Sequence, residues 1–117
     1  MTDDDFRKAL SSANELRITF VGRKTEKKFS TPVWFVNQGD KVYLLPVNGT
    51  ASDWYKDVLK DPKMELQASG KKMTAKTVPI TDKKRIEEVV EMFRKKYGAG
   101  DMKRYYPRTD AAVELSV

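Results

Sequence analysis

The sequence contains no cysteine and no histidine in its 117 residues. A chain without them forms no disulfide framework, no Cys/His zinc site, no thiol nucleophile and no Ser-His-Asp triad. Histidine-based acid–base catalysis is excluded as well. We therefore expect no metal site. If the protein is an enzyme, a bound organic cofactor is the natural source of its reactivity.

Long apolar runs are also missing. No stretch approaches the ~20 apolar residues that a membrane-spanning helix needs. The first residues are acidic and carry no apolar core of the signal-peptide kind. We therefore expect a cytoplasmic protein without a membrane span. The length, with 39% hydrophobic and 34% charged residues, predicts a single soluble domain over residues 1–117.

Positive charge predominates over negative charge. Lys and Arg number 23 and Asp and Glu number 17, so the net charge is +6. A basic domain favours anionic partners such as nucleic acid, a phosphorylated cofactor or an acidic membrane surface. The positive residues gather in three segments, at 23–28, 71–76 and 103–108. These segments either line one anion pocket or keep the surface solvated.

The apolar periodicity predicts an α+β, mainly β, fold. Alternating residues predict six strands, at 16–21, 29–36, 42–47, 63–68, 72–78 and 113–117. Helical spacing predicts a short helix within 1–14, one beginning at Ser52 or Asp53, and a long one at 82–97 that ends at Gly98. Residues 99–109 are expected to form a loop. Six hairpin-connected strands can close into a small antiparallel barrel with helices at its ends.

Interruptions of the predicted strands mark one candidate binding surface. The turn at 22–28 places backbone N–H groups beside several cations, which suits a phosphate. Pro32 and Pro46 remove ladder donors from neighbouring strands. These interruptions leave either a slot for a planar ring or a twisted sheet edge.

The stretch 48–55 is a second candidate. Gly49 permits close approach of the backbone to a ligand, and the following helix N-terminus favours an anion. Trp54 and Tyr55 are adjacent, so they cannot both face the same core. Either Trp54 packs in the core with Val58 while Tyr55 covers the surface, or one of the two rings faces a ligand or a second subunit.

Three tyrosines lie late in the chain. Tyr97 continues the apolar stripe of the long helix, so we expect it in the core. Tyr105 and Tyr106 lie in the predicted basic loop. They are suited either to stacking on nucleic acid bases or to lining a substrate pocket.

Taken in order, these motifs resemble the deazaflavin-dependent nitroreductase family. They are Gly22-Arg23-Lys24-Thr25-x-Lys27, Ser30-Thr31-Pro32-Val33, Asn48-Gly49, and Trp54-Tyr55 followed by Asp61-Pro62. That family belongs to the split β-barrel flavin and deazaflavin oxidoreductases, which include the pyridoxamine 5′-phosphate oxidase-like proteins. The resemblance covers about residues 15–117. It implies a six-stranded antiparallel split β-barrel with flanking helices.

The resemblance also implies a cofactor-binding groove. The implied contacts of the phosphate or anionic tail are Arg23, Lys24, Lys27 and Lys28, with Trp54 and Tyr55 closing that end. The implied contacts of the ring are Thr31, Pro32 and Val33, bounded by Pro46, Val47, Asn48 and Gly49. Tyr105 and Tyr106 fall where family members hold the substrate. The chain departs from the frequent family pattern at Glu26, where Gly is common, and near Ala111, where Arg is common.

The implied function is an oxidoreductase of the nitroreductase or quinone reductase kind. A reduced deazaflavin (F-420), with FMN as the close second, would pass a hydride to a small electron-poor acceptor such as a quinone. No side chain is expected to be an obligatory acid, base or nucleophile. The alternatives are a barrel that binds a flavin-type cofactor without turnover and, less favoured, a small nucleic-acid-binding barrel. We also expect a homodimer with Trp34, Phe35 and Tyr55 at the contact.

Overall fold

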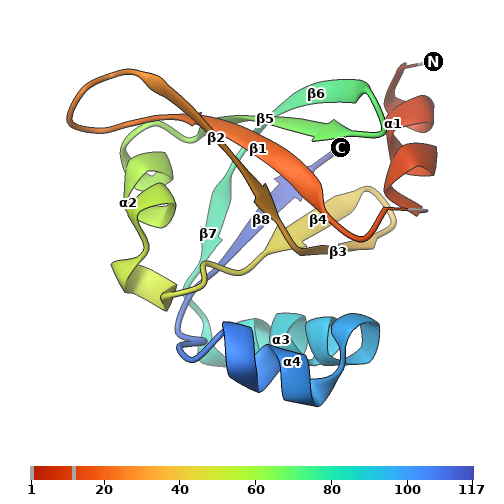
Figure 1. The fold of residues 1–117 in the computed structure, drawn as a ribbon, viewed down its shortest axis with the longest axis vertical. Coiled ribbons are helices and arrows are strands. Elements are labelled where there is room, and N and C mark those ends of the chain that lie inside the picture. The colour runs from red at the N-terminus through yellow and green to blue at the C-terminus, as the bar shows by residue number, and fades with distance from the viewer. Residues whose placement is uncertain (1, 12) are drawn as a thin grey trace.

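The computed structural model describes residues 2–11 and 13–117, with side chains from residue 6 onward except at 12. In this part of the chain, eight strands form two four-stranded antiparallel sheets, in the orders β2-β1-β5-β6 and β3-β4-β8-β7 (Figure 1). The strands are β1 (Leu16–Val21), β2 (Lys28–Val33), β3 (Phe35–Gln38), β4 (Lys41–Leu44), β5 (Lys63–Ala68), β6 (Lys71–Lys76), β7 (Val78–Ile80) and β8 (Ala112–Ser116). The helices are α1 (Thr2–Ser11), the 3-10 turn η1 (Gly49–Ala51), α2 (Asp53–Lys60), α3 (Lys83–Tyr97) and α4 (Ala99–Tyr105).

One core lies between the two sheets, with α1 and α2 packed against it. On β1, Leu16 and Ile18 are buried while Arg17 is exposed. On β8, Val113 and Leu115 enter the same core. Successive side chains of a strand point to opposite faces, so each sheet turns one set of apolar residues inward.

A second core lies between the other face of the second sheet and helices α3 and α4. Tyr43 on β4 belongs to it, whereas its neighbours Val42 and Leu44 belong to the first core. Phe93 of α3 is fully buried there. The second sheet is therefore covered on both faces, while α3 and α4 lie together beyond it (Figure 1).

The prediction of six strands and a closed barrel was wrong, although the antiparallel α+β arrangement is confirmed. The predicted strand 29–36 is divided at Trp34 into β2 and β3, which belong to different sheets. Immediately after the break, the Phe35 N–H donates to the Tyr97 hydroxyl at 3.1 Å. A side chain thus replaces the ladder partner at the point where the chain changes sheets.

The second division falls at Thr77, between β6 and β7. The Thr77 N–H and hydroxyl both donate to the Pro62 carbonyl, at 2.7 and 2.9 Å. Pro79, which directly follows the predicted strand 72–78, lies inside β7, where it pairs with Val113. A proline is tolerated there because β7 is an edge strand.

The helices follow the prediction except at 99–109. The expected N-terminal and long helices are present as α1 and α3, and Gly98 ends α3 with φ of +95°. The predicted helix over 1–14 also included residues 1 and 12, which lie outside the described part. Residues 99–109, expected to be a loop, begin with α4. In residues 2–11 and 13–117, no helix is long and apolar enough to cross a membrane.

Candidate functional site

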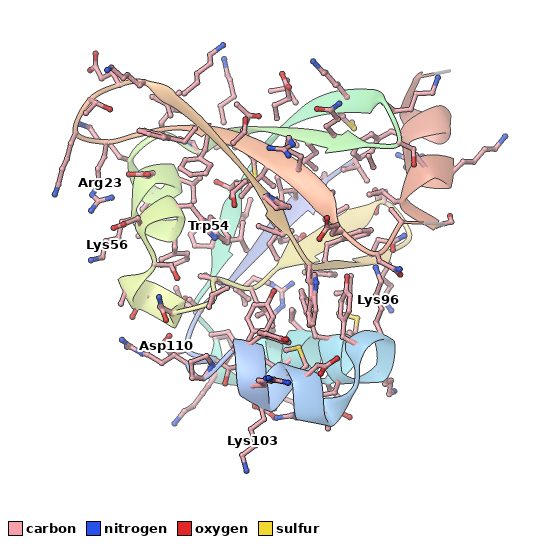
Figure 2. All side chains as sticks on the ribbon, viewed as in Figure 1. Arg23, Trp54, Lys56, Lys96, Lys103 and Asp110 are labelled. Carbon is pink, nitrogen blue, oxygen red and sulfur yellow. The ribbon has the colours of Figure 1, made fainter. Side chains whose placement is uncertain are left out.

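Arg23 fixes the turn between β1 and β2 against α2. Its guanidinium Nη1 lies 2.7 Å from Asp57 Oδ1, and its backbone N–H donates to the same oxygen at 3.0 Å. The Asp53 carboxylate lies 3.6 Å from Nη2. Asp57 is buried, so Arg23 supplies the charge and the hydrogen bonds that its burial requires. Figure 2 shows Arg23 beside α2.

The backbone donors of this turn are mostly used within the turn. The Gly22 N–H donates to the Lys27 carbonyl at 2.8 Å, and the Glu26 N–H donates to the Gly22 carbonyl at 2.9 Å. Glu26 holds φ of +58°, a conformation that glycine adopts more readily. Among the described residues, the N–H groups of Lys24 and Thr25 have no protein acceptor. The turn therefore presents fewer free N–H donors than its sequence predicts.

A cavity of ≈ 390 Å³, here called the basic cavity, opens beside this turn. Its lining residues are Phe20, Gly22, Arg23, Lys24, Thr25, Phe29, Ser30, Thr31, Asp53 and Asp57. Of the predicted phosphate ligands, Arg23 and Lys24 line it, whereas Lys27 and Lys28 do not. Lys24 forms no ion pair with any described residue. Of the two cations that line the basic cavity, it is therefore the one whose charge is available to a ligand.

A second cavity of ≈ 410 Å³, here called the aromatic cavity, lies farther along the same strand and helix. On β2, Thr31 lines the basic cavity while Pro32 and Val33 line the aromatic one. On α2, Asp53 lines the first and Trp54 the second. The other residues that line the aromatic cavity are Glu15, Trp34, Leu45, Val47, Asp101, Tyr105 and Tyr106. We call the two cavities together the groove.

Trp34 forms a fixed wall of the aromatic cavity. Its ring is stacked on Tyr97, with centroids 4.2 Å apart and planes inclined by 7°. The Tyr97 hydroxyl donates to the Asn14 carbonyl at 2.5 Å and accepts from the Phe35 N–H. Tyr105 meets Trp34 edge-on at 5.6 Å. Because the supporting Tyr97 is hydrogen-bonded at its far end, the orientation of Trp34 is set without a ligand.

Burial raises the pKa of two nearby tyrosines still further above neutral pH. It raises the pKa of Tyr97 to about 12, with a further contribution from the Glu15 carboxylate. Burial also raises the pKa of Tyr106 well above its ordinary value, although a hydrogen bond with the Trp34 backbone opposes the shift. Tyr106 therefore lines the cavity as a neutral phenol at neutral pH.

Asn48 and Gly49 do not line the groove. They lie against the segment of the chain that precedes β8. The Thr50 N–H and hydroxyl both donate to the Asp110 carboxylate at 3.0 Å. These hydrogen bonds, together with Arg108, hold the pKa of Asp110 below its usual range. Gly49 has φ of +56°, and a Cβ there would lie 1.8 Å from Asp110 Oδ1. The glycine is therefore needed for close approach to a carboxylate of the chain itself.

The positions of Trp54 and Tyr55 are the reverse of the first alternative, which placed Trp54 in the core and Tyr55 on the surface. Tyr55 is buried in the core with Val58, while Trp54 lines the aromatic cavity from the side of α2 that faces the strands (Figure 2). Tyr55 and Phe35 are 5% and 0% exposed, so neither is available as the dimer contact we expected. Pro46 is likewise buried and lies outside the groove lining.

Sequence reasoning missed several residues of the groove. They are Glu15, Phe20, Phe29, Leu45, Asp57 and Asp101, together with Trp34, which was expected at a dimer contact and here lines the aromatic cavity. For Asp57 a signal was present: it stands four residues after Asp53, so both carboxylates share one face of α2. An acidic face beside a basic turn favours pairing between the two.

Comparison with known proteins gives a family and a fold. The family model described as "Uncharacterized protein conserved in bacteria (DUF2255)" matches residues 7–115. No curated protein matches the chain in sequence. The structure described as an F420-H2 dependent reductase is 18% identical, with a TM-score of 0.69, over 88% of this chain and 94% of that chain.

Two further solved structures share the fold. A NimC/NimA family protein from Clostridium acetobutylicum is 14% identical, with a TM-score of 0.68, over 100% of this chain and 83% of that chain. HutZ, described as a heme storage protein from Vibrio cholerae, is 9% identical, with a TM-score of 0.71, over 97% and 87%. At these identities the likeness is one of fold. At that level it agrees with the split-barrel-like fold that the resemblance implied.

Proposed function

The chain belongs to the DUF2255 family, and we propose that this member is an oxidoreductase. It would pass a hydride from a reduced deazaflavin (F-420) or from reduced FMN to a small electron-poor acceptor such as a quinone. One observation carries the proposal: the basic and aromatic cavities lie side by side along β2 and α2. The charged residues that line the basic cavity are Arg23, Lys24, Asp53 and Asp57, and the cation without an ion pair to a described residue is Lys24. A groove with this ammonium at one end and aromatic rings at the other suits a flat ring that bears a phosphate. The reductase among the structural neighbours supports this choice.

The residues of the basic cavity fit an anionic group. The donors that would hold it are the Lys24 ammonium, the N–H groups of Lys24 and Thr25, and the hydroxyl of Thr31. The Ser30 hydroxyl is already hydrogen-bonded to the Thr19 hydroxyl at 2.8 Å. Arg23 neutralises the buried Asp57 carboxylate at 2.7 Å. The second carboxylate of the lining, Asp53, lies 3.6 Å from Arg23 and is exposed to water, which screens its charge. Thr31, Pro32 and Val33 would lie against the ring, on the stretch of β2 where one cavity gives way to the other.

When bound, the reduced cofactor supplies the hydride. The contribution of the chain is position and exclusion of water. Trp34 is already oriented by Tyr97, and Trp54 faces it from α2. Tyr105 and Tyr106 would orient the acceptor, with a phenol hydrogen bond available to an acceptor oxygen as charge develops there. No side chain of the groove has to act as an acid, base or nucleophile in this account.

The test is an equilibrium titration of the protein with deazaflavin, FMN and heme, monitored by cofactor absorbance. Lys24→Gln should weaken binding of the deazaflavin or FMN about 5- to 30-fold, the range expected for one charge-assisted hydrogen bond. Lys72→Gln, on the remote strand β6, makes the same change of net charge and should leave affinity unchanged. Equal affinities of the two variants would remove the basic cavity from the site.

Turnover separates the proposal from its alternatives. Anaerobic mixing of the protein, reduced deazaflavin and a small quinone should give saturable oxidation of the cofactor. Binding without faster oxidation would identify a cofactor-binding protein instead. Tighter binding of heme than of either flavin-type cofactor would favour a role like that named for HutZ. Strongly salt-dependent binding to single-stranded nucleic acid would favour the third alternative.

We also propose a homodimer. The sheets leave four edge strands, β2 and β6 in one and β3 and β7 in the other. Phe29 on β2 is 45% exposed and Val78 on β7 is 52% exposed. Apolar side chains on unpaired edges favour association with a second copy. Light scattering at micromolar concentration should give twice the chain mass, and a monomeric mass would contradict the proposal.

A further inference from the structure

The charge lining the aromatic cavity is opposite to the charge of the protein. The chain carries a net charge of +6, yet the charged residues that line this cavity are Glu15 and Asp101. Among the described residues, no Lys or Arg contributes to its lining. An occupant of this cavity would therefore meet two exposed carboxylates and no cation among the lining residues.

The remaining walls suit a cation as well. Four aromatic residues line the cavity: Trp34, Trp54, Tyr105 and Tyr106. The face of an aromatic ring carries partial negative charge and attracts a cation, most strongly for tryptophan. Trp34 cannot turn away easily because its other face is stacked on Tyr97.

The nearby cations of the chain do not already fill this role. Arg104 lies 5.6 Å from the centroid of the Tyr105 ring, but it does not line the cavity. Lys103 points away from the molecule (Figure 2). The aromatic rings and the two carboxylates therefore face the cavity without a cationic partner among its lining residues.

We propose that the aromatic cavity binds a flat organic cation, of the N-alkylated heteroaromatic class. The assignment of this cation as the hydride acceptor rests on the proposed function, whereas its binding does not. A quaternary nitrogen in the ring makes the ring electron-poor, which is the property that a hydride acceptor needs. The cavity would then select its acceptor by charge, and neutral rings of the same shape would bind more weakly.

The test compares two probes of nearly equal shape. The cation 1-methylnicotinamide and neutral nicotinamide are titrated into the cofactor-free protein by calorimetry. Tryptophan fluorescence serves as a second signal, because both tryptophans of the chain line this cavity. The cation should bind at least about tenfold more tightly, the combined effect of aromatic faces and two carboxylates. Equal affinity for the two probes, or no binding of either at millimolar concentration, would overturn the inference.

Matched variants locate the site. The double variant Glu15→Gln and Asp101→Asn keeps the side-chain shapes and should remove most of the preference for the cation. The double variant Glu87→Gln and Glu88→Gln makes the same change of net charge on the exposed face of α3 and should retain it. A preference that survives the first variant would place the cation elsewhere and refute the proposal.

Titration of the same samples with deazaflavin and FMN distinguishes this inference from the proposed function. Cofactor binding without a preference for the cation would overturn the inference and leave the oxidoreductase proposal standing. A clear preference for the cation without binding of either cofactor would support the cation site and overturn its role as a hydride acceptor.

Discussion

Replacing Arg23 with alanine should destabilise the fold, although exposed basic residues usually contribute little to stability. Arg23 is partly buried, and its guanidinium lies 2.7 Å from the buried Asp57 carboxylate. Removal of the guanidinium leaves that carboxylate with the Arg23 backbone N–H as its remaining hydrogen-bond donor among the described residues. The expected loss of stability therefore comes from leaving the buried Asp57 carboxylate without its cation, not from losing an ion pair at the surface.

The magnitude follows from the partners. Breaking a fully buried ion pair costs about 3–5 kcal/mol, and a hydrogen bond to a charged group contributes about 1.5–3 kcal/mol. The Arg23 side chain is 25% exposed, so water can reach part of the vacated space. We therefore expect a loss of about 2 kcal/mol of unfolding free energy. For a chain of this length that corresponds to a decrease in Tm of about 8 °C.

The assay is thermal and urea unfolding of Arg23→Ala, Asp57→Asn and the double variant. The two residues should show a coupling energy of about 1–2 kcal/mol, because they form one ion pair. Lys24→Ala has no ion pair to lose and should stay within about 0.5 kcal/mol of the parent. A Tm of Arg23→Ala equal to that of Lys24→Ala would refute the reasoning and return Arg23 to the set of free phosphate ligands.

Three other predictions follow from the same structure. Since the pKa of Tyr97 is about 12 in the fold and ordinarily 10, the folded state binds more protons between these values, so stability falls as the pH rises through that window. Tyr97→Phe should flatten this decrease in urea titrations; an unchanged slope would contradict it. Gly49→Ala should lower the Tm much more than Gly39→Ala, because both glycines have positive φ but only Gly49 has a carboxylate oxygen within 1.8 Å of a built Cβ; equal losses would show that φ alone matters. Tyr105→Phe and Tyr106→Phe should reduce turnover with a quinone by no more than about 100-fold while cofactor affinity stays nearly unchanged; complete loss of activity in either would make that tyrosine a true proton donor.

Strands β1 and β5 were predictable because their residues alternate over their full length. β1 and β5 have the predicted bounds, since buried and exposed positions follow each other without interruption. The breaks at Trp34 and Thr77 were not predictable from this pattern. Around Trp34 the residues are continuously apolar, and Thr77 continues the alternation of Met73 and Ala75, so neither position marks a boundary. The change of sheet depends on distant partners, Tyr97 and Pro62.

Helix α4 shows the same limit. Its seven residues include a glycine and contribute one buried side chain, Met102. So short a segment has little helical stability of its own. It is held by the second core, where Met102 and Tyr106 pack with Phe93 of α3. Tertiary packing of this kind leaves no periodic signal in the segment itself.

The candidate site was predictable in type more than in detail. The basic turn and the late tyrosines do line neighbouring cavities, as charge and aromatic content suggested. Arg23 pairs with Asp57, a residue 34 positions away in the sequence. The sequence of the turn alone does not show this pairing, so it suggests more unpaired positive charge than the folded turn has. The two carboxylates of the aromatic cavity, Glu15 and Asp101, come from segments far apart in sequence. No local motif identifies them as neighbours.

The most direct measurement of the central claim is a map of backbone amide shifts on addition of oxidised deazaflavin to the isotope-labelled protein. The account predicts that the largest changes fall along the groove, at 22–25, 30–34 and 53–54, with small changes in β6 and on the outer face of α3. Saturating shifts confined to the groove would establish it as the cofactor site. No shifts at millimolar deazaflavin or FMN, or shifts concentrated outside these segments, would contradict the account.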